Sequence, residues 1–278
     1  MCHVTIHGSP TRPASPASRR RWLVVITTLW AVLVTGLALY AAHRGGSTVR
    51  TQTSVSQALP TVDRAVAEAV TAAAPAGAVA QVGGYHEVSG RCTVTAVRNG
   101  ARYERVAHLY VPAGQEGALL DRIRAALPGD YDAQVRDRRL TADAGDFVAL
   151  KGSVEGAGEV RISADTGCRP LTAPVREASE AADRRPVEAV LATLKVGGAA
   201  WQTHRVPCAQ GGYVRTVQAD GPAGSGPASL VDALRATAPD AVVARPELYA
   251  YRSGPVGIVA RTRNGAVTVT ATTGCGVQ

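Results

Sequence analysis

An uncharged run of 21 residues, from Trp22 to Ala42, constrains this chain more than any other feature. It is rich in Leu, Val, Ile and Ala, and a helix of this length spans about 30 Å, the thickness of the hydrocarbon core of a bilayer. Trp22 and Tyr40 lie near its two ends, where amphipathic rings suit the headgroup region. The run therefore predicts a transmembrane helix over residues 22–42.

The charges around this run predict its orientation. Four arginines lie within about 20 residues before it and two lie within about 20 residues after it: Arg12, Arg19, Arg20 and Arg21 before, Arg44 and Arg50 after. The excess of cations favours a cytoplasmic tail over residues 1–21 and an exterior position for residues 43–278.

Cleavage of the run as a secretory signal is the alternative. A signal peptide has an apolar core of about 7–15 residues, which is shorter than this run, so we favour an uncleaved anchor. The stretch from Ser18 to Leu23 also resembles a twin-arginine export signal, although the strongly apolar run fits that pathway poorly. Each alternative exports the same segment, and cleavage would release it as a secreted protein.

The net charge of +8 reflects this topology more than a polyanionic partner. Six of the 30 Lys and Arg residues and none of the 22 Asp and Glu residues precede Asp63, which leaves a net charge of +2 for residues 63–278. A nearly neutral exterior argues against a nucleic-acid partner. The chain has 50 Ala and 28 Arg but only two Lys, a bias that indicates a GC-rich bacterial genome.

Four cysteines follow the apolar run: Cys92, Cys168, Cys208 and Cys275. An even number of cysteines in an exported segment predicts disulfides, and their wide spacing is not that of a zinc site. Four cysteines allow three pairings.

An internal repeat selects among these pairings. Residues 165–168 and residues 272–275 both end in Thr-Gly-Cys at an offset of 107, and the apolar helix pattern of residues 120–128 recurs at 231–239. A period near 110 indicates two related domains rather than a solenoid. Each copy then holds one early and one late cysteine, which predicts the disulfides Cys92–Cys168 and Cys208–Cys275.

The pattern of each copy predicts a helix, two strands, a second helix and three closing strands. Pro60 and Pro186 suit the first turn of the two opening helices, and Asn99-Gly100 and Asn264-Gly265 are strong hairpin signals. Strands joined by tight turns pair antiparallel, so we expect an α+β fold: one transmembrane helix followed by two small α/β sandwich domains. The expected segments are a stalk over 43–59, repeat 1 over 60–168, a polar connector over 169–185 that is briefly helical at most, and repeat 2 over 186–278.

Candidate catalytic residues are few. The sequence has no G-x-S-x-G nucleophile elbow and no phosphate-binding P-loop. We therefore expect no metal and no cofactor. The weak acid–base candidates are His86, His108 and His204, of which the first and last occupy similar positions before the first cysteine of each copy. We interpret them as solvated or capping side chains, because no Ser, Cys or carboxylate recurs beside both in the sequence.

These observations predict a single-pass bacterial envelope protein with a non-catalytic binding or scaffold role. The expected partners are the membrane itself and an envelope protein or cell-wall component, with a ligand cleft at the interface between the two copies. An envelope hydrolase with a site formed between the copies is one alternative. A ligand-sensing subunit that acts through a membrane partner is another.

Overall fold

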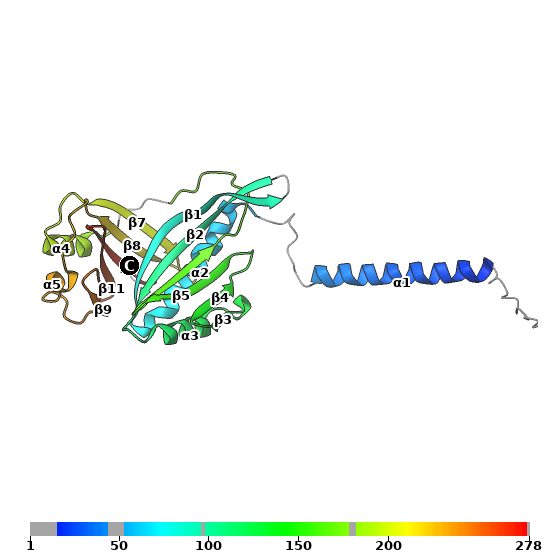
Figure 1. The fold of residues 1–278 in the computed structure, drawn as a ribbon, viewed down its shortest axis with the longest axis horizontal. Coiled ribbons are helices and arrows are strands. Elements are labelled where there is room, and N and C mark those ends of the chain that lie inside the picture. Colours follow the sequence, from blue (N-terminus) through cyan, green and yellow to red (C-terminus); the bar gives the residue numbers. More distant parts are fainter. Residues whose placement is uncertain (1–15, 44–52, 96–97, 178–181, 277–278) are drawn as a thin grey trace, which may run out of the picture. The chain divides into compact units, whose positions relative to one another are not determined.

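The computed structural model describes residues 16–43, 53–95, 98–177 and 182–276 (Figure 1). The chain forms two units, residues 1–51 and residues 52–278. In the first unit, helix α1 runs from Pro16 to His43 and contains one segment, Arg21–Tyr40, that is long and apolar enough to cross a membrane. Its three threonine hydroxyls donate to carbonyls four residues earlier, which satisfies these polar groups within the helix: Thr27, Thr28 and Thr35.

The second unit is an α+β fold, mostly β, built on two antiparallel six-stranded sheets (Figure 1). The first half contains α2 (Val55–Ala73), η2 (Ala74–Ala76), β1 (Val79–Thr95), β2 (Arg98–Tyr110), α3 (Glu116–Ala126), η3 (Gly129–Tyr131), β3 (Gln134–Arg136), β4 (Arg139–Asp143), β5 (Ala149–Gly156) and β6 (Glu159–Asp165). The second half contains α4 (Arg185–Leu194), β7 (Ala200–Pro207), β8 (Tyr213–Asp220), α5 (Leu230–Leu234), β9 (Val243–Arg245), β10 (Leu248–Ser253), β11 (Val256–Arg263) and β12 (Ala266–Thr273).

The two sheets have the same strand order, β1-β2-β6-β5-β4-β3 and β7-β8-β12-β11-β10-β9. Four strands close each half, so the expectation of three was wrong by one. The additional strands, β3 and β9, have three residues each and form hairpins with β4 and β10. Three residues are too few to show an alternation of polar and apolar side chains, so the sequence does not predict these strands.

Helix α2 begins at Val55, five residues before the expected start at Pro60. The backbone N–H of Ser54 donates to Gln57 Oε1 at 2.9 Å, and Val55 is fully buried with its N–H on Pro170 O at 3.0 Å. Pro60 removes one helical hydrogen bond near the start of the helix, and the burial of the first turn outweighs that loss. The expected stalk therefore ends before Val55, and residues 44–52 of it lie outside the described residues.

Strands β1 and β2 form a hairpin, but Asn99-Gly100 is not its turn. Gly100 pairs with Cys92 inside the ladder, on the far side of residues 96–97, which lie outside the described residues. A Cβ on Gly100 would lie 2.2 Å from the backbone oxygen of Arg169, whose strand bridge to Ala101 passes directly over this glycine. Close approach of backbone explains the glycine here. The turn at Asn264-Gly265 is confirmed, with φ of 52° and 75°.

Replacement of Gly100 with alanine should lower the free energy of unfolding by about 1–3 kcal/mol, because backbone has to move to admit the methyl group. Gly117 in α3 is the matched control, since a Cβ there meets nothing within 4 Å. Gly117→Ala should stabilise the fold by about 0.5–1 kcal/mol through its higher helix propensity. Urea unfolding of both variants measures the difference, and equal effects would contradict the close approach at Gly100.

Each sheet packs one face against helices, and part of the opposite face meets the other half of the unit. Tyr249 and Tyr251 of β10 pack in the core under α4 and α5. The alternate residues Leu248 and Ala250 belong to a separate cluster with Tyr110 of β2 and with β1. Because successive side chains of a strand point to opposite faces, this cluster joins the two halves through their helix-free faces.

An ion cluster reinforces this junction. Glu159 of β6, in the first half, pairs through its two carboxylate oxygens with Arg245 and Arg261 of the second half. Arg261 also donates to the hydroxyl of Tyr110 at 3.2 Å. The arrangement leaves no unpaired carboxylate oxygen on Glu159, a condition that a mostly buried charge requires.

Both halves carry a disulfide, Cys92–Cys168 and Cys208–Cys275, and the pairing is the one that the repeat predicts. The second disulfide packs against the core of the first half, where the Thr71 hydroxyl of α2 lies 3.2 Å from Cys275 Sγ.

The connector is more than a solvated linker. The Arg169 side chain is 1% exposed and bonds to Thr53 and to the carbonyls of Thr166 and Asp146. The described part of the connector before Arg185 has no helix, and residues 178–181 lie outside it.

Candidate functional site

A cleft of about 770 Å³ opens at the junction of the two halves. Its walls come from β1, β2 and β6 of the first sheet, from β7 and β8 of the second sheet, and from the connector. The lining residues are Gly83, Gly84, Tyr85, His86, Tyr103, Val106, His108, Arg161, Val175, Glu177, Gln202, Thr203, His204 and Gln218. Arg161 and Glu177 are the two fully charged side chains among them, so the lining is close to neutral.

The cleft brings together all three histidines that the sequence singles out. His86 lies on β1 with its side chain 60% exposed, His108 lies on β2 at 32%, and His204 lies on β7 at 11%. Each faces a carboxylate, at 3.8 Å, 3.8 Å and 2.7 Å respectively: Glu104, Glu155 and Glu177. The sequence does not show these pairs, because the glutamates come from other strands, β2 and β5, and from the connector.

The shortest of these contacts belongs to a network at the edge of β1. His204 Nδ1 lies 2.7 Å from Glu177 Oε2, while Glu177 Oε1 accepts from Arg105 Nη2 and from the backbone N–H of Tyr85, both at 2.7 Å. Arg105 also donates to the backbone oxygen of Arg205 at 2.6 Å. Four segments of both halves therefore meet on one carboxylate and one guanidinium.

Asp63 of α2 completes the network on the helix side. Its carboxylate lies 3.3 Å from Arg105 Nε and accepts from the Tyr85 hydroxyl at 2.7 Å, and the guanidinium lies 4.0 Å from the centre of the Tyr85 ring. The side chain of Arg105 is 2% exposed. Two carboxylates and an aromatic face compensate this buried cation, and loss of Arg105 would leave both carboxylates without it.

The network sets the ionisation of its carboxyl groups in opposite directions. Burial raises the pKa of Glu177, but the hydrogen bond from His204 and the charge of Arg105 lower it by more, so the pKa lies below its usual value. For Asp63, burial outweighs the charge of Arg105 and raises the pKa. Burial also raises the pKa of the Tyr85 hydroxyl well above its usual range, which keeps it a hydrogen-bond donor.

Gly84 lacks a side chain at the point where Glu177 and His204 approach β1. An added Cβ would lie 3.0 Å from both Glu177 Oε1 and the His204 ring. Gly83 and Gly84 form an irregularity in the β1–β2 ladder between Val82 and Tyr85, so β1 bends where the carboxylate reaches its backbone.

The lowered pKa of His108 predicts that the stability of the fold depends on pH. Burial, followed by the charges of three arginines, lowers its pKa to about 4: Arg261, Arg161 and Arg263. An imidazole with a lowered pKa takes up protons more readily in the unfolded chain, so its contribution to stability is complete above about pH 6.5 and is lost as the pH falls toward 4.

We therefore expect the stability of the wild type to fall between pH 6.5 and pH 4.5, and to fall less in His108→Gln. Thermal unfolding across this window is the measurement. His86→Gln is the matched control, a largely exposed histidine in the lining of the same cleft. An identical slope in wild type and His108→Gln would rule out this source of pH dependence.

None of the other sequence-predicted positions is among the residues that line the cleft. Arg19, Arg20 and Arg21 belong to α1, in the first unit. None of the four disulfide cysteines lines the cleft, although Cys208 and Cys275 line a second cavity of about 510 Å³ with residues of α2 and α3. Among the described residues, no cluster of His, Cys, Asp and Glu could hold a metal ion.

Sequence reasoning missed Asp63, Tyr85, Arg105 and Glu177. One signal was present: Arg105 alternates with Ala107 and Leu109, so a charge stands on the apolar face of its strand. A buried arginine requires a carboxylate partner, but the sequence does not reveal which one.

In comparisons with known proteins, no family model, no curated protein and no solved structure matches this chain. The interpretation of the cleft therefore depends on its own chemistry.

Proposed function

We propose that this chain is a single-pass protein of the bacterial cell envelope whose extracytoplasmic unit binds a partner in the cleft between two related domains. The observation that carries the proposal is the cleft itself, which opens at the junction of the two halves and is lined by side chains from both. The lining joins polar, aromatic and apolar side chains, which suits recognition of a partner.

Three further observations support the topology and the duplication. The apolar helix with arginines before it suits an uncleaved anchor with its N-terminus in the cytoplasm. Two disulfides suit an oxidising compartment. The identical strand order of the two sheets, with a helix before each pair of leading strands, is what a duplicated domain would give.

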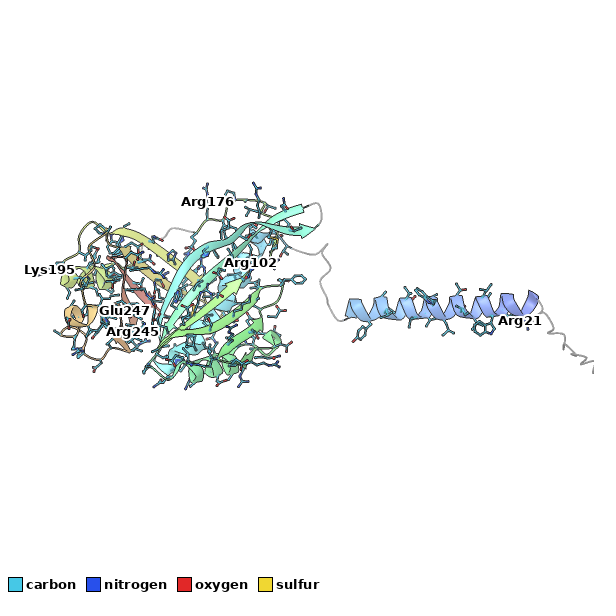
Figure 2. The ribbon with its side chains drawn as sticks, in the orientation of Figure 1. Arg21, Arg102, Arg176, Lys195, Arg245 and Glu247 are labelled. Carbon is cyan, nitrogen blue, oxygen red and sulfur yellow. A yellow bond between two sulfur atoms is a disulfide. The ribbon has the colours of Figure 1, made fainter. Side chains whose placement is uncertain are left out.

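Photo-crosslinking in growing cells tests the binding proposal. A photoreactive residue at Gln202, in the cleft, should give a discrete crosslinked product with an envelope protein or cell-wall fragment. The matched position is Lys195, an exposed residue at the end of α4 (Figure 2). Products that are identical from both positions, or absent from Gln202, would contradict the cleft as a binding site.

A reporter fused after Arg50 tests the topology. Alkaline phosphatase, which requires export for its disulfides, should be active there, and a reporter that works only in the cytoplasm should be inactive. The reverse result would place the cleft in the cytoplasm and overturn the proposed localisation.

A hydrolase is the second candidate, because the cleft holds three histidines and Glu177 fixes Nδ1 of one of them, His204. A water molecule activated by this pair would have to serve as the nucleophile. The triple variant His86→Gln/His108→Gln/His204→Gln should lose any hydrolysis of envelope substrates if this candidate is correct. Retention of the cellular role by a folded triple variant would exclude it.

A further inference from the structure

Strand β7 is an edge strand, and its outward hydrogen-bonding groups can be identified from its pairing. Cys208 N donates to Gly212 O at 3.1 Å, so this pair is hydrogen-bonded, and the register continues without a shift to Ala200 opposite Asp220. Hydrogen-bonded and non-hydrogen-bonded pairs alternate in an antiparallel ladder. The N–H and C=O groups of even-numbered β7 residues therefore face β8, and those of odd-numbered residues face outward.

The end of this edge nearest the disulfide is closed. Pro207 has no N–H to offer, and the outward oxygen of Arg205 accepts from Arg105 Nη1 at 2.6 Å. That bond also confirms the direction in which the odd-numbered groups point. Natural proteins close sheet edges in this way, because a free edge pairs with other chains.

Two outward N–H groups on the edge of β1 are hydrogen-bonded as well. The outward N–H of Val82 donates to Thr216 Oγ1 at 3.2 Å, and that of Tyr85 donates to Glu177 Oε1 at 2.7 Å. Side chains from β8 and from the connector thus take the places that a neighbouring strand would fill.

Trp201 and Thr203 remain on the β7 edge. Within the part of the chain that the structure describes, no hydrogen bond reaches their outward N–H and C=O groups. The Trp201 ring packs against the helix-side core and lies 4.8 Å from the guanidinium carbon of Arg184. Thr203 shares that orientation, yet it lines the cleft, so it is the strand edge at Thr203 that borders the open space.

We propose that the occupant of the cleft is an extended polypeptide segment that adds to the free edge of β7 as a further strand. The inference rests on the proposed function and specifies its ligand. An extended main chain offers N–H and C=O groups at the spacing that Trp201 and Thr203 present, and its alternate side chains would face Val106 and His108 across the cleft. The near-neutral lining disfavours a polyanion.

The open groups of Thr203 differ from these bonded groups because Thr203 also lines the cleft. Four outward positions nearby are unavailable, because three groups are hydrogen-bonded and Pro207 has no N–H. Of the two β7 residues without such a bond, Thr203 lines the cleft. Edge groups left open beside a preformed cleft are typical of strand-addition sites, where main-chain bonds supply affinity and side-chain pockets supply specificity.

Substitutions at Thr203 test the inference without touching the β7–β8 ladder. Thr203→Pro removes the outward N–H and blocks pairing, whereas Thr203→Ala keeps the N–H and removes only the side chain. Linear peptides are selected from a random displayed library against the full-length protein in nanodiscs, and soluble muropeptides are the non-peptide probe. Selected peptides should bind Thr203→Ala nearly as well as wild type and Thr203→Pro about tenfold or more weakly.

Hydrogen exchange provides a second measurement that does not depend on the folding of a variant. A selected peptide should slow exchange at the Thr203 amide of the wild type by about tenfold or more. Equal binding to Thr203→Pro, unchanged exchange at Thr203, or binding of muropeptides with no peptide selected would overturn the inference. The proposed function fails separately, when crosslinking from Gln202 captures nothing beyond the Lys195 control.

Discussion

Replacement of Cys92 and Cys168 with alanine lowers the free energy of unfolding by about 4 kcal/mol, and replacement of Cys208 and Cys275 costs a similar amount. The two loops span 76 and 67 residues, and in the chain-entropy model the release of loops this long adds much freedom to the unfolded chain. Chemical denaturation of the full-length protein in nanodiscs is the measurement, with linear extrapolation to water.

The two disulfides should differ in their effect on the junction. Cys208 and Cys275 pack against the core of the first half, beside Thr71 of α2, so their loss should also increase hydrogen exchange in α2. Cys2→Ser is the control that leaves both disulfides intact. Stability unchanged within about 0.5 kcal/mol in either alanine pair would contradict a structural role for that disulfide.

Replacement of Arg105 with methionine should cost about 3–5 kcal/mol, the second large effect. Methionine fills much of the same space, but Asp63 and Glu177 would lose their shared cation while remaining mostly buried. Charge without a partner in such a place is expensive, because burial removes its hydration.

A compensated variant separates the charge from the packing. If unpaired charge causes the loss, Arg105→Met combined with Asp63→Asn and Glu177→Gln should be more stable than Arg105→Met alone. Arg124→Met is the matched control, since its contact with Asp121 on α3 is exposed at 3.9 Å and should contribute less than about 1 kcal/mol. Equal losses of unfolding free energy in Arg105→Met and Arg124→Met would show that the buried network stabilises the fold no more than an exposed ion pair does.

Local patterns in the sequence predicted a large part of the fold. The repeated Thr-Gly-Cys ending correctly paired the cysteines, and Asn264-Gly265 correctly located a hairpin. Pro186 correctly marked the first turn of α4. These features depend on residues near one another in the sequence or on a sequence pattern that recurs, and both can be recognised without a structure.

Features that depend on residues distant in the sequence could not be predicted from local patterns. Gly100 resembles a turn glycine, yet it is present because Arg169 passes over it. Pro60 resembles a helix start, yet burial of Val55 extends the helix beyond it. The polar network joins residues that lie far apart in the sequence: Asp63, Tyr85, Arg105, Glu177 and His204.

The cleft is a fixed site only if the two halves behave as one body. The shared core, the Glu159 cluster and the Arg105 network all cross the junction, so the halves should lose their structure together. Hydrogen exchange with mass spectrometry at increasing urea concentrations measures the unfolding of each sheet separately in one sample. Peptides from β6 and β12 should become exposed at the same urea concentration; two well-separated midpoints would show independent halves and contradict a preformed cleft.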